Sequence, residues 1–284
     1  MSEPASPARR PCVRILRHAA AGLVAAALLG ACSKSPEDLA RYAALHHARG
    51  AHVEAIATWT EALAKSPDDP ALLLGRGRSY LDSRQHEAAR ADLERCLALR
   101  PGLTEAGFLL AREALESRRW DEALARLGAL RGAEPTRATH EIGRVHVDRC
   151  LAGLRAVLRD AETMAPRQLD TLWRAVSLLR LDDARAYVRD PRHRSEVALL
   201  EPRIERAEAD LAAARAALEE VARGTDDHAR HAACDLAELD MLCGRGHAAD
   251  ERLARLLTDG ASDALAVRAL RLRAEAAERQ GDLD

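Results

Sequence analysis

Residues of the same kind recur every 34 positions along the first half of this chain of 284 residues. A repeat of this length corresponds to one small structural element, which buries its apolar face only by stacking against its neighbours. The chain is therefore predicted to form a row of repeats rather than a fold around one large core. When the repeats are aligned, five positions carry similar residues in each repeat. They are Pro67, Pro101 and Pro135; Ala43, Gly77 and Ala111; Ala55, Ala89 and Ala123; Trp59, Leu93 and Leu127; Ala62, Cys96 and Leu130.

The composition of the chain indicates that each repeat is helical. It contains 61 Ala and 43 Leu, but only 11 Val, 4 Ile and 7 aromatic residues. Ala and Leu are strong helix formers, whereas β-branched and aromatic residues fill pleated sheets. We therefore predict an all-α fold, and the composition argues against a β-sandwich, a β-barrel or a doubly wound sheet. Because so many apolar residues are Ala, the helices are expected to approach one another closely.

Two helices are expected in each repeat. Close approach of two helices requires small side chains, so the column of Ala43 is expected to face the column of Ala55 across a helix pair. The recurring proline ends the second helix, because it has no N–H to donate and restricts the residue before it. This places the repeats at 36–69, 70–103 and 104–137.

The pattern resembles the tetratricopeptide repeat, a 34-residue pair of antiparallel helices. The run from 119 to 124, Arg-Trp-Asp-Glu-Ala-Leu, is the segment most similar to that family. The resemblance implies a right-handed α-solenoid that binds protein partners in its concave groove. Arg76 and Gly107 depart from the family pattern, which prefers an apolar residue and a large residue at these positions.

In this family, four positions of each first helix line the groove. The apolar members of this set would contact a peptide or a helix, and the two arginines are predicted to bind a carboxylate or an acidic segment. The alternative is that the set consists of solvated arginines and of leucines on the convex side. A clamp for chaperone tails is not expected, since Ala40 and Ala44 occupy its positions. The predicted groove residues are Leu74, Arg78, Leu81, Phe108, Arg112 and Leu115.

The repeat register weakens after residue 137. We expect degenerate helical hairpins in residues 138–227, near 138–163, 168–188 and 201–223. The last of these carries an apolar seam, typical of close antiparallel packing, with Ile204, Leu211 and Leu218 seven residues apart. Repeat-like residues return in 228–284, with one repeat near 230–263 and a last helix near 264–279. That final repeat is incomplete, so we expect either a truncated chain or an apolar face covered by a partner.

The amino terminus has the order of a secretory signal. Arg9, Arg10, Arg14 and Arg17 precede thirteen uncharged residues from 19 to 31, and Cys32 follows. Thirteen residues are too few to span a bilayer of about 30 Å comfortably. We therefore interpret residues 1–31 as an export signal. The alternatives are an uncleaved anchor helix and a soluble protein with an Ala-rich start.

Leu28-Leu29-Gly30-Ala31-Cys32 resembles the lipobox of bacterial lipoproteins. This resemblance implies that Cys32 is lipidated, that the signal peptide is removed before it, and that residues 32–35 form a linker. Two or three acyl chains are enough for stable anchoring. The implied location is the bacterial cell envelope. Ser33 favours the periplasmic face of the outer membrane, whereas Lys34 and Ser35 leave the inner membrane as an alternative.

Charge and motifs limit the remaining functions. Without residues 1–31 the chain has 39 basic and 44 acidic residues, so nucleic acid is not an expected partner. No catalytic motif is recognisable, and neither an enzymatic activity nor a cofactor is expected. His228, His231 and Cys234 form an i, i+3, i+6 row and are weak candidates for a metal site.

Taken together, these patterns predict a membrane-anchored scaffold or adaptor of the cell envelope that binds protein partners. By analogy of architecture, the partners are pilus, secretion or cell-wall machinery. The alternative is a metal-binding or enzymatic envelope protein that uses residues 138–234.

Overall fold

The computed structural model describes residues 34–164, 169–190, 197–259 and 262–281. Within these ranges every regular element is a helix, which confirms the predicted all-α class. None of the described helices is both long enough and apolar enough to cross a membrane. The predicted signal peptide and Cys32 lie outside the described residues. The chain divides into two compact units, Met1–Leu99 (unit 1) and Arg100–Asp284 (unit 2).

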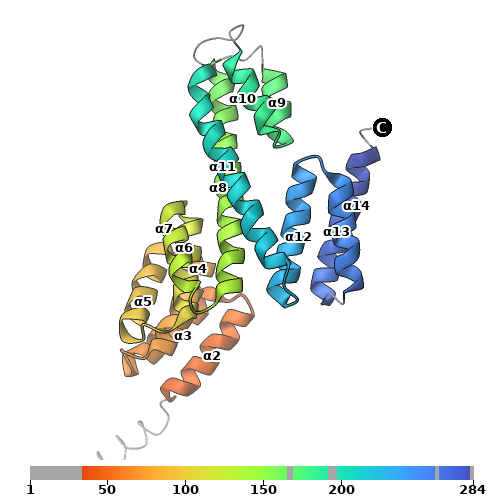
Figure 1. Cartoon of the computed structure of the whole chain (residues 1–284). Coiled ribbons are helices and arrows are strands. Elements are labelled where there is room, and N and C mark those ends of the chain that lie inside the picture. Colours follow the sequence, from red (N-terminus) through yellow and green to blue (C-terminus); the bar gives the residue numbers. More distant parts are fainter. Residues whose placement is uncertain (1–33, 165–168, 191–196, 260–261, 282–284) are drawn as a thin grey trace, which may run out of the picture. The chain divides into compact units, whose positions relative to one another are not determined.

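Unit 1 consists of two antiparallel helix pairs (Figure 1). The first helix of each pair begins in the same way, with a capping side chain followed by a proline in the first turn. Ser35 Oγ accepts a hydrogen bond from the Asp38 N–H at 3.1 Å, and Asp69 Oδ1 accepts one from the Ala71 N–H at 2.8 Å. The helices are α2 (Pro36–Ala48), α3 (His52–Lys65), α4 (Pro70–Asp82) and α5 (His86–Leu99).

Unit 2 contains the remaining helices. Most of them pack pairwise with their sequence neighbours, but the two longest, α8 and α11, lie side by side although they are separated in sequence (Figure 1). The helices of unit 2 are α6 (Thr104–Glu116), α7 (Trp120–Leu130), α8 (Pro135–Met164), α9 (Leu169–Ser177), α10 (Leu181–Arg189), the 3₁₀ helix η1 (Val197–Leu200), α11 (Glu201–Ala222), α12 (Asp227–Leu242), α13 (Gly246–Thr258) and α14 (Asp263–Gly281).

One turn geometry joins the two helices of a pair in both units. The connection has three residues, and the middle one has a positive φ between 49° and 76°. Its N–H and the next N–H donate to carbonyls of the last helical turn, which satisfies groups that the helix end leaves unpaired. The middle residues are Gly50, Arg84, Arg118, Leu179 and Gly244. The α9–α10 pair therefore has the same turn as the predicted repeats.

The small residues of the repeat lie where the helices of each pair meet. Ala43, Ala55, Ala89 and Ala123 are fully enclosed. A methyl group on Gly77 would lie 2.9 Å from Leu93 Cγ, closer than two carbon atoms approach without a shift. The predicted register of small side chains at the helix contacts is therefore confirmed by their burial.

The expected hairpins near 138–163 and 201–223 are wrong, whereas the hairpin near 168–188 is present as α9 and α10. Residues 138–163 lie within α8 and residues 201–222 within α11, and these two helices pack against each other instead. Gly143 of α8 faces the Ala214–Leu218 turn of α11, with Leu218 Cγ 2.9 Å and the Ala214 carbonyl oxygen 3.4 Å from an added methyl position.

The contact at Gly143 matches the contact at Gly77. In both, a glycine of one helix meets a leucine and the alanine four residues before it, Leu93 and Ala89 in unit 1. Helices α8 and α11 therefore form one helix pair that has been lengthened and opened, and the α9–α10 pair lies in the connection. This insertion explains why the repeat register weakens after residue 137.

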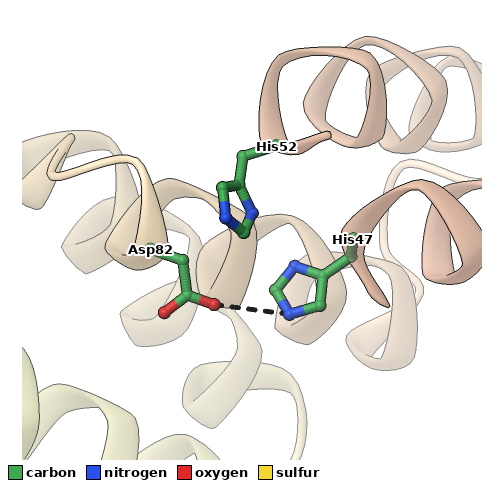
Figure 2. Close-up of side chains that lie close together, drawn as sticks. All are labelled: His47, His52 and Asp82. Atoms are coloured by element: carbon green, nitrogen blue, oxygen red, sulfur yellow. Dashed lines mark ion pairs between the residues drawn. The ribbon is translucent and has the colours of Figure 1, made fainter. Parts of the chain in front are cut away.

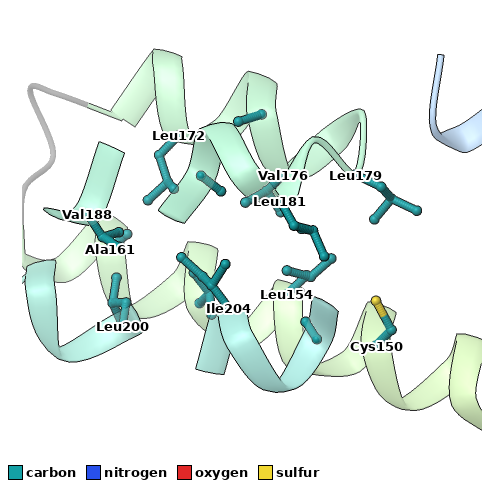
Figure 3. Close-up of a cluster of buried hydrophobic side chains, with 14 of the residues drawn as sticks. Cys150, Leu154, Ala161, Leu172, Val176, Leu179, Leu181, Val188, Leu200 and Ile204 are labelled. Carbon is teal, nitrogen blue, oxygen red and sulfur yellow. The ribbon is translucent and has the colours of Figure 1, made fainter. Parts of the chain in front are cut away.

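The α9–α10 pair is held to the far end of α8 and α11 by a hydrophobic cluster (Figure 3). Leu154 and Ala161 of α8, Leu172 and Val176 of α9, and Leu181 and Val188 of α10 are buried in it. Leu200 of η1 and Ile204 of α11 close the cluster from the other side. The apolar seam expected along 201–223 is thus a buried contact between helices rather than a surface for a partner.

Buried carboxylates paired with arginine connect neighbouring helices. Arg76 donates to both oxygens of Asp92, at 2.6 and 2.8 Å, and so links α4 to α5. This ion pair accounts for the departure of Arg76 from the repeat pattern. In unit 2, Arg149 of α8 binds Asp210 of α11, and Arg215 of α11 donates to Asp240 of α12 at 3.0 Å. The planar guanidinium fork suits such two-oxygen contacts.

Two glycines of α8 test the lengthened pair. Gly143→Ala is expected to lower the free energy of unfolding by about 1–3 kcal/mol, because the new methyl group overpacks the contact with the enclosed Leu218 side chain. Gly153→Ala is the matched control, since nothing lies within 4 Å of its methyl position. It should raise the free energy of unfolding by about 0.5–1 kcal/mol through helix propensity. Urea unfolding followed by circular dichroism measures both, and equal effects would contradict the pairing of α8 with α11.

Candidate functional site

A hollow of about 420 Å³ lies in unit 2 among α8, α11, α12 and α14. It exists because α12 packs against both α8 and α14, and Leu218 of α11 completes the lining. We call it the unit 2 hollow. Its lining residues are His140, Arg144, Val147, Asp148, Leu151, Leu218, His231, Asp235, Glu238, Leu239, Leu242 and Arg268.

The apolar part of the hollow is continuous with the core of unit 2. Leu218 and Leu239 are buried, whereas Val147, Leu151 and Leu242 are only partly covered. Val147 and Leu151 are four residues apart on α8 and therefore lie on one face of that helix. The hollow thus offers a floor of aliphatic side chains that part of another molecule can contact.

A chain of hydrogen bonds forms the polar side of the hollow. His140 Nε2 donates to Asp235 Oδ2 at 2.8 Å, and Arg268 donates to Asp235 Oδ1 at 2.6 Å. Arg268 also donates to Glu238 at 2.9 Å. These hydrogen bonds connect α8, α12 and α14, so they hold together three of the four helices around the hollow.

The Asp235 carboxylate is stabilised in its charged form. Burial alone would raise its pKa, but the hydrogen bond from His140 and the charge and hydrogen bond of Arg268 outweigh burial and hold the pKa below its ordinary value. Arg144, which is exposed, lies 4.0 Å from the same carboxylate. The polar side of the hollow is therefore a fixed, charged wall next to an apolar floor.

Thiol chemistry is not favoured at the two buried cysteines of this region. Burial raises the pKa of Cys150 to about 12 and that of Cys234 to about 11. Both side chains therefore stay protonated at neutral pH, whereas the thiolate is the reactive form. They contribute to packing, as their enclosure in apolar clusters indicates.

Two of the predicted groove residues are buried. Leu81 and Phe108 are 1% and 6% exposed, so their prediction as contact residues is wrong. Phe108 packs in a core cluster, and the guanidinium of Arg137 lies 3.8 Å from its ring centroid. The sequence pattern placed them on the correct helices but did not show how deeply these helices pack.

The other groove candidates are more accessible. Leu74 and Leu115 are partly buried, Arg78 is partly buried, and Arg112 is exposed. Arg112 donates to Glu116 at 2.7 Å, one helical turn away. Arg78 belongs to unit 1 and Arg112 to unit 2. Their joint binding of a carboxylate stays a prediction.

The row of His228, His231 and Cys234 does not converge. Cys234 faces the core between α12, α13 and α14, the His228 ring contacts the ring of His140, and His231 Nδ1 donates to the Asp227 carbonyl at 2.7 Å. Among the described residues, the ligand atoms of this row do not lie within metal-binding distance of one another. The side chains of one helix diverge at this spacing.

Sequence reasoning missed two features. The unit 2 hollow combines residues up to 128 positions apart, from His140 to Arg268, and a repeat register that stops at 137 cannot align them. A second cluster, His47, His52 and Asp82 in unit 1, brings together the ends of three helices (Figure 2). The sequence spacing of these three residues matches no ligand motif.

The repeat pattern has a counterpart among known proteins. Residues 80–140 match the tetratricopeptide repeat family. A co-chaperone of Fusarium oxysporum with tetratricopeptide repeats and a J domain is 33% identical over 130 residues, which are 42% of this chain and 25% of that protein. The chain thus spans a quarter of the length of this curated relative.

Two solved structures of tetratricopeptide repeat proteins are similar to the chain. One, from Parabacteroides merdae, is 14% identical with a TM-score of 0.39, and the alignment covers 84% of both chains. The other, a thermophilic protein from Thermus thermophilus, is 21% identical with a TM-score of 0.37, and the alignment covers 84% of this chain and 98% of that one.

The charged wall of the hollow predicts a pH-dependent stability. Asp235→Asn is expected to lower the free energy of unfolding by about 2–3 kcal/mol at pH 7, because it removes a charged acceptor from His140 and Arg268. Since the pKa of Asp235 is depressed in the folded state, its contribution is present at neutral pH and is lost as the pH falls below about 4. The difference between wild type and variant, measured by urea unfolding from pH 7 downward, should therefore shrink in acid.

Asp227→Asn is the control on the same helix. Asp227 is exposed and pairs only with Arg230 one turn away, so its loss should change the free energy of unfolding by less than about 0.5 kcal/mol. A pH-independent difference for Asp235→Asn would show that Asp235 acts through shape rather than through charge.

Proposed function

We propose that this chain is a membrane-anchored scaffold of the bacterial cell envelope, which binds a segment of a partner protein in the unit 2 hollow. The single observation that carries this proposal is the hollow itself, an aliphatic floor beside a fixed charged wall. Its volume of about 420 Å³ is within the range of about 300–1,000 Å³ typical of sites that enclose small ligands or a few side chains. The match of residues 80–140 to a repeat family that mediates protein–protein interaction supports the same conclusion.

The chemistry of the hollow indicates what kind of segment fits. Val147 and Leu151 are exposed enough to contact apolar side chains of a partner, and burial of such side chains supplies affinity. Arg144 and Asp148 are both exposed at the edge of the hollow. They favour a partner segment that carries charges of opposite sign beside its apolar side chains. We therefore expect an amphipathic helix or peptide with two or more aliphatic residues between charged ones.

The envelope location rests on the amino-terminal sequence. Residues 1–31 have the order of an export signal, and the residues before Cys32 resemble the lipobox of bacterial lipoproteins. A lipid anchor would hold the scaffold at a membrane surface, where pilus, secretion and cell-wall machinery assembles. The choice among these partners is an analogy of architecture.

Affinity capture after crosslinking in intact cells tests both parts of the proposal. The bait is the full-length chain, expressed in a bacterium that processes lipoproteins, and captured proteins are quantified by mass spectrometry. Cys32→Ser should abolish acyl labelling of the chain and move it out of the membrane fraction. Arg144→Glu combined with Asp148→Lys should reduce capture of the partner at least about tenfold while leaving the helical content unchanged.

The matched control reverses two charges elsewhere on the same helix. Arg159→Glu with Glu162→Lys changes exposed residues of α8 that do not line the hollow, and it should leave capture intact. A second comparison is Arg78→Glu with Arg112→Glu, the predicted groove pair. Loss of capture in that variant alone would place the binding site there, and retention of capture in every variant would refute a binding site in the hollow.

A further inference from the structure

Unit 1 brings three metal-ligating side chains together, independently of the proposed partner site. His47 is next to last in α2, His52 is the first residue of α3, and Asp82 is the last residue of α4 (Figure 2). One ligand atom from each lies within 4.8 Å of the other two. The positive φ of Gly50 reverses the chain between α2 and α3, so that the two imidazole rings meet at 5.3 Å between centroids.

The two ring nitrogens of His47 have different neighbours. Ser79 Oγ lies 3.0 Å from His47 Nδ1 and also 3.0 Å from the Gly75 carbonyl oxygen. When Ser79 donates to Gly75, it accepts a hydrogen bond from His47 Nδ1, and Nε2 of the neutral ring then carries the lone pair that a metal ion needs.

The Nε2 atom of His47 lies next to a carboxylate. Its distance to Asp82 Oδ2 is 3.3 Å. A metal ion bound to both atoms would replace this direct contact and would use the lone pairs of both.

His52 adds a second imidazole ring to the cluster. Its Nδ1 is buried and has no hydrogen-bond partner within the described part of the chain. A buried nitrogen left unpaired costs free energy in a folded protein. A metal ion bound to this nitrogen would satisfy it.

The spacing fits a transition-metal ion. A tetrahedral ion with bonds of about 2.1 Å holds its ligand atoms about 3.4 Å apart, close to the 3.3 Å between His47 Nε2 and Asp82 Oδ2. Two imidazole nitrogens and one carboxylate oxygen suit Zn²⁺ and its neighbours, whereas Mg²⁺ and Ca²⁺ prefer oxygen ligands. The side chains of His47 and Asp82 are each 24% exposed, so an ion can enter from solvent and water can complete the shell.

We propose that His47, His52 and Asp82 form a binding site for a divalent transition-metal ion of the Zn²⁺ type. The ion would tie the α2–α3 turn to the end of α4 and so join the first helix pair to the second. Arg78 contributes a positive charge near His47 and works against the ion. The site is consequently expected to select ions that bind imidazole strongly over ions held by charge alone.

Zinc binding to the purified full-length chain in detergent tests the proposal. Isothermal titration calorimetry with Zn²⁺ should show one ion per chain at this site, and His52→Ala or Asp82→Asn should each weaken it at least about tenfold. His46→Ala, one residue from His47 but outside the cluster, is the matched control and should not change the affinity. Zn²⁺ should raise the melting temperature of the wild type and of His46→Ala but not of the two ligand variants.

Three outcomes would overturn the proposal. The first is the absence of stoichiometric Zn²⁺ binding. The second is binding that both ligand variants retain, or that is lost with His231→Ala or Cys234→Ser instead. The third is equal affinity for Mg²⁺, which would show that the imidazole nitrogens do not take part.

Discussion

In the part of the chain that the structure describes, close contacts between paired helices are made where one helix presents a glycine or an alanine to the other. Gly77 and Gly143 lack the carbon atom that would collide with Leu93 and Leu218, and enclosed alanines take the same role at the other pairs. Dispersion contacts fall off steeply with distance, so this close approach supplies much of the cohesion of a core that has few aromatic side chains. The order of the helices, and with it the position of the hollow, depends on that contact.

The arginine-rich composition follows from the same close packing. Tightly packed helices leave little room for polar groups, yet Asp92, Asp210 and Asp240 are buried between them. Each is paired with arginine. Arg76 and Arg149 contact both oxygens of Asp92 and Asp210, and Arg215 donates to Oδ1 of Asp240. Removing one member would leave a buried charge, so these pairs specify which helices are neighbours more than they add to stability.

The local features of the fold could be predicted from the sequence, and the long-range ones could not. Helix class, the pairs up to residue 137 and the small-residue contacts follow from periodicity, which is a short-range signal. The pairing of Gly143 with Leu218 was missed because its two halves are separated by the α9–α10 pair. The predicted contact role of Leu81 and Phe108 was wrong because the spacing of residues along a helix shows which residues share a face, but not how deeply that face is buried. Three of the five left-handed turn residues, Arg84, Arg118 and Leu179, carry no glycine signal at all.

The length of α8 connects two distant parts of unit 2. At about 1.5 Å per residue, the 30 residues of α8 extend about 45 Å, more than twice the length of the 13-residue α6. Val147 and Leu151 in the floor of the hollow lie on the same helix as Leu154 and Ala161, which pack in the hydrophobic cluster with the α9–α10 pair. The contact residues of the α9–α10 pair and the floor of the hollow therefore belong to one continuous helix, which joins them without an intervening loop.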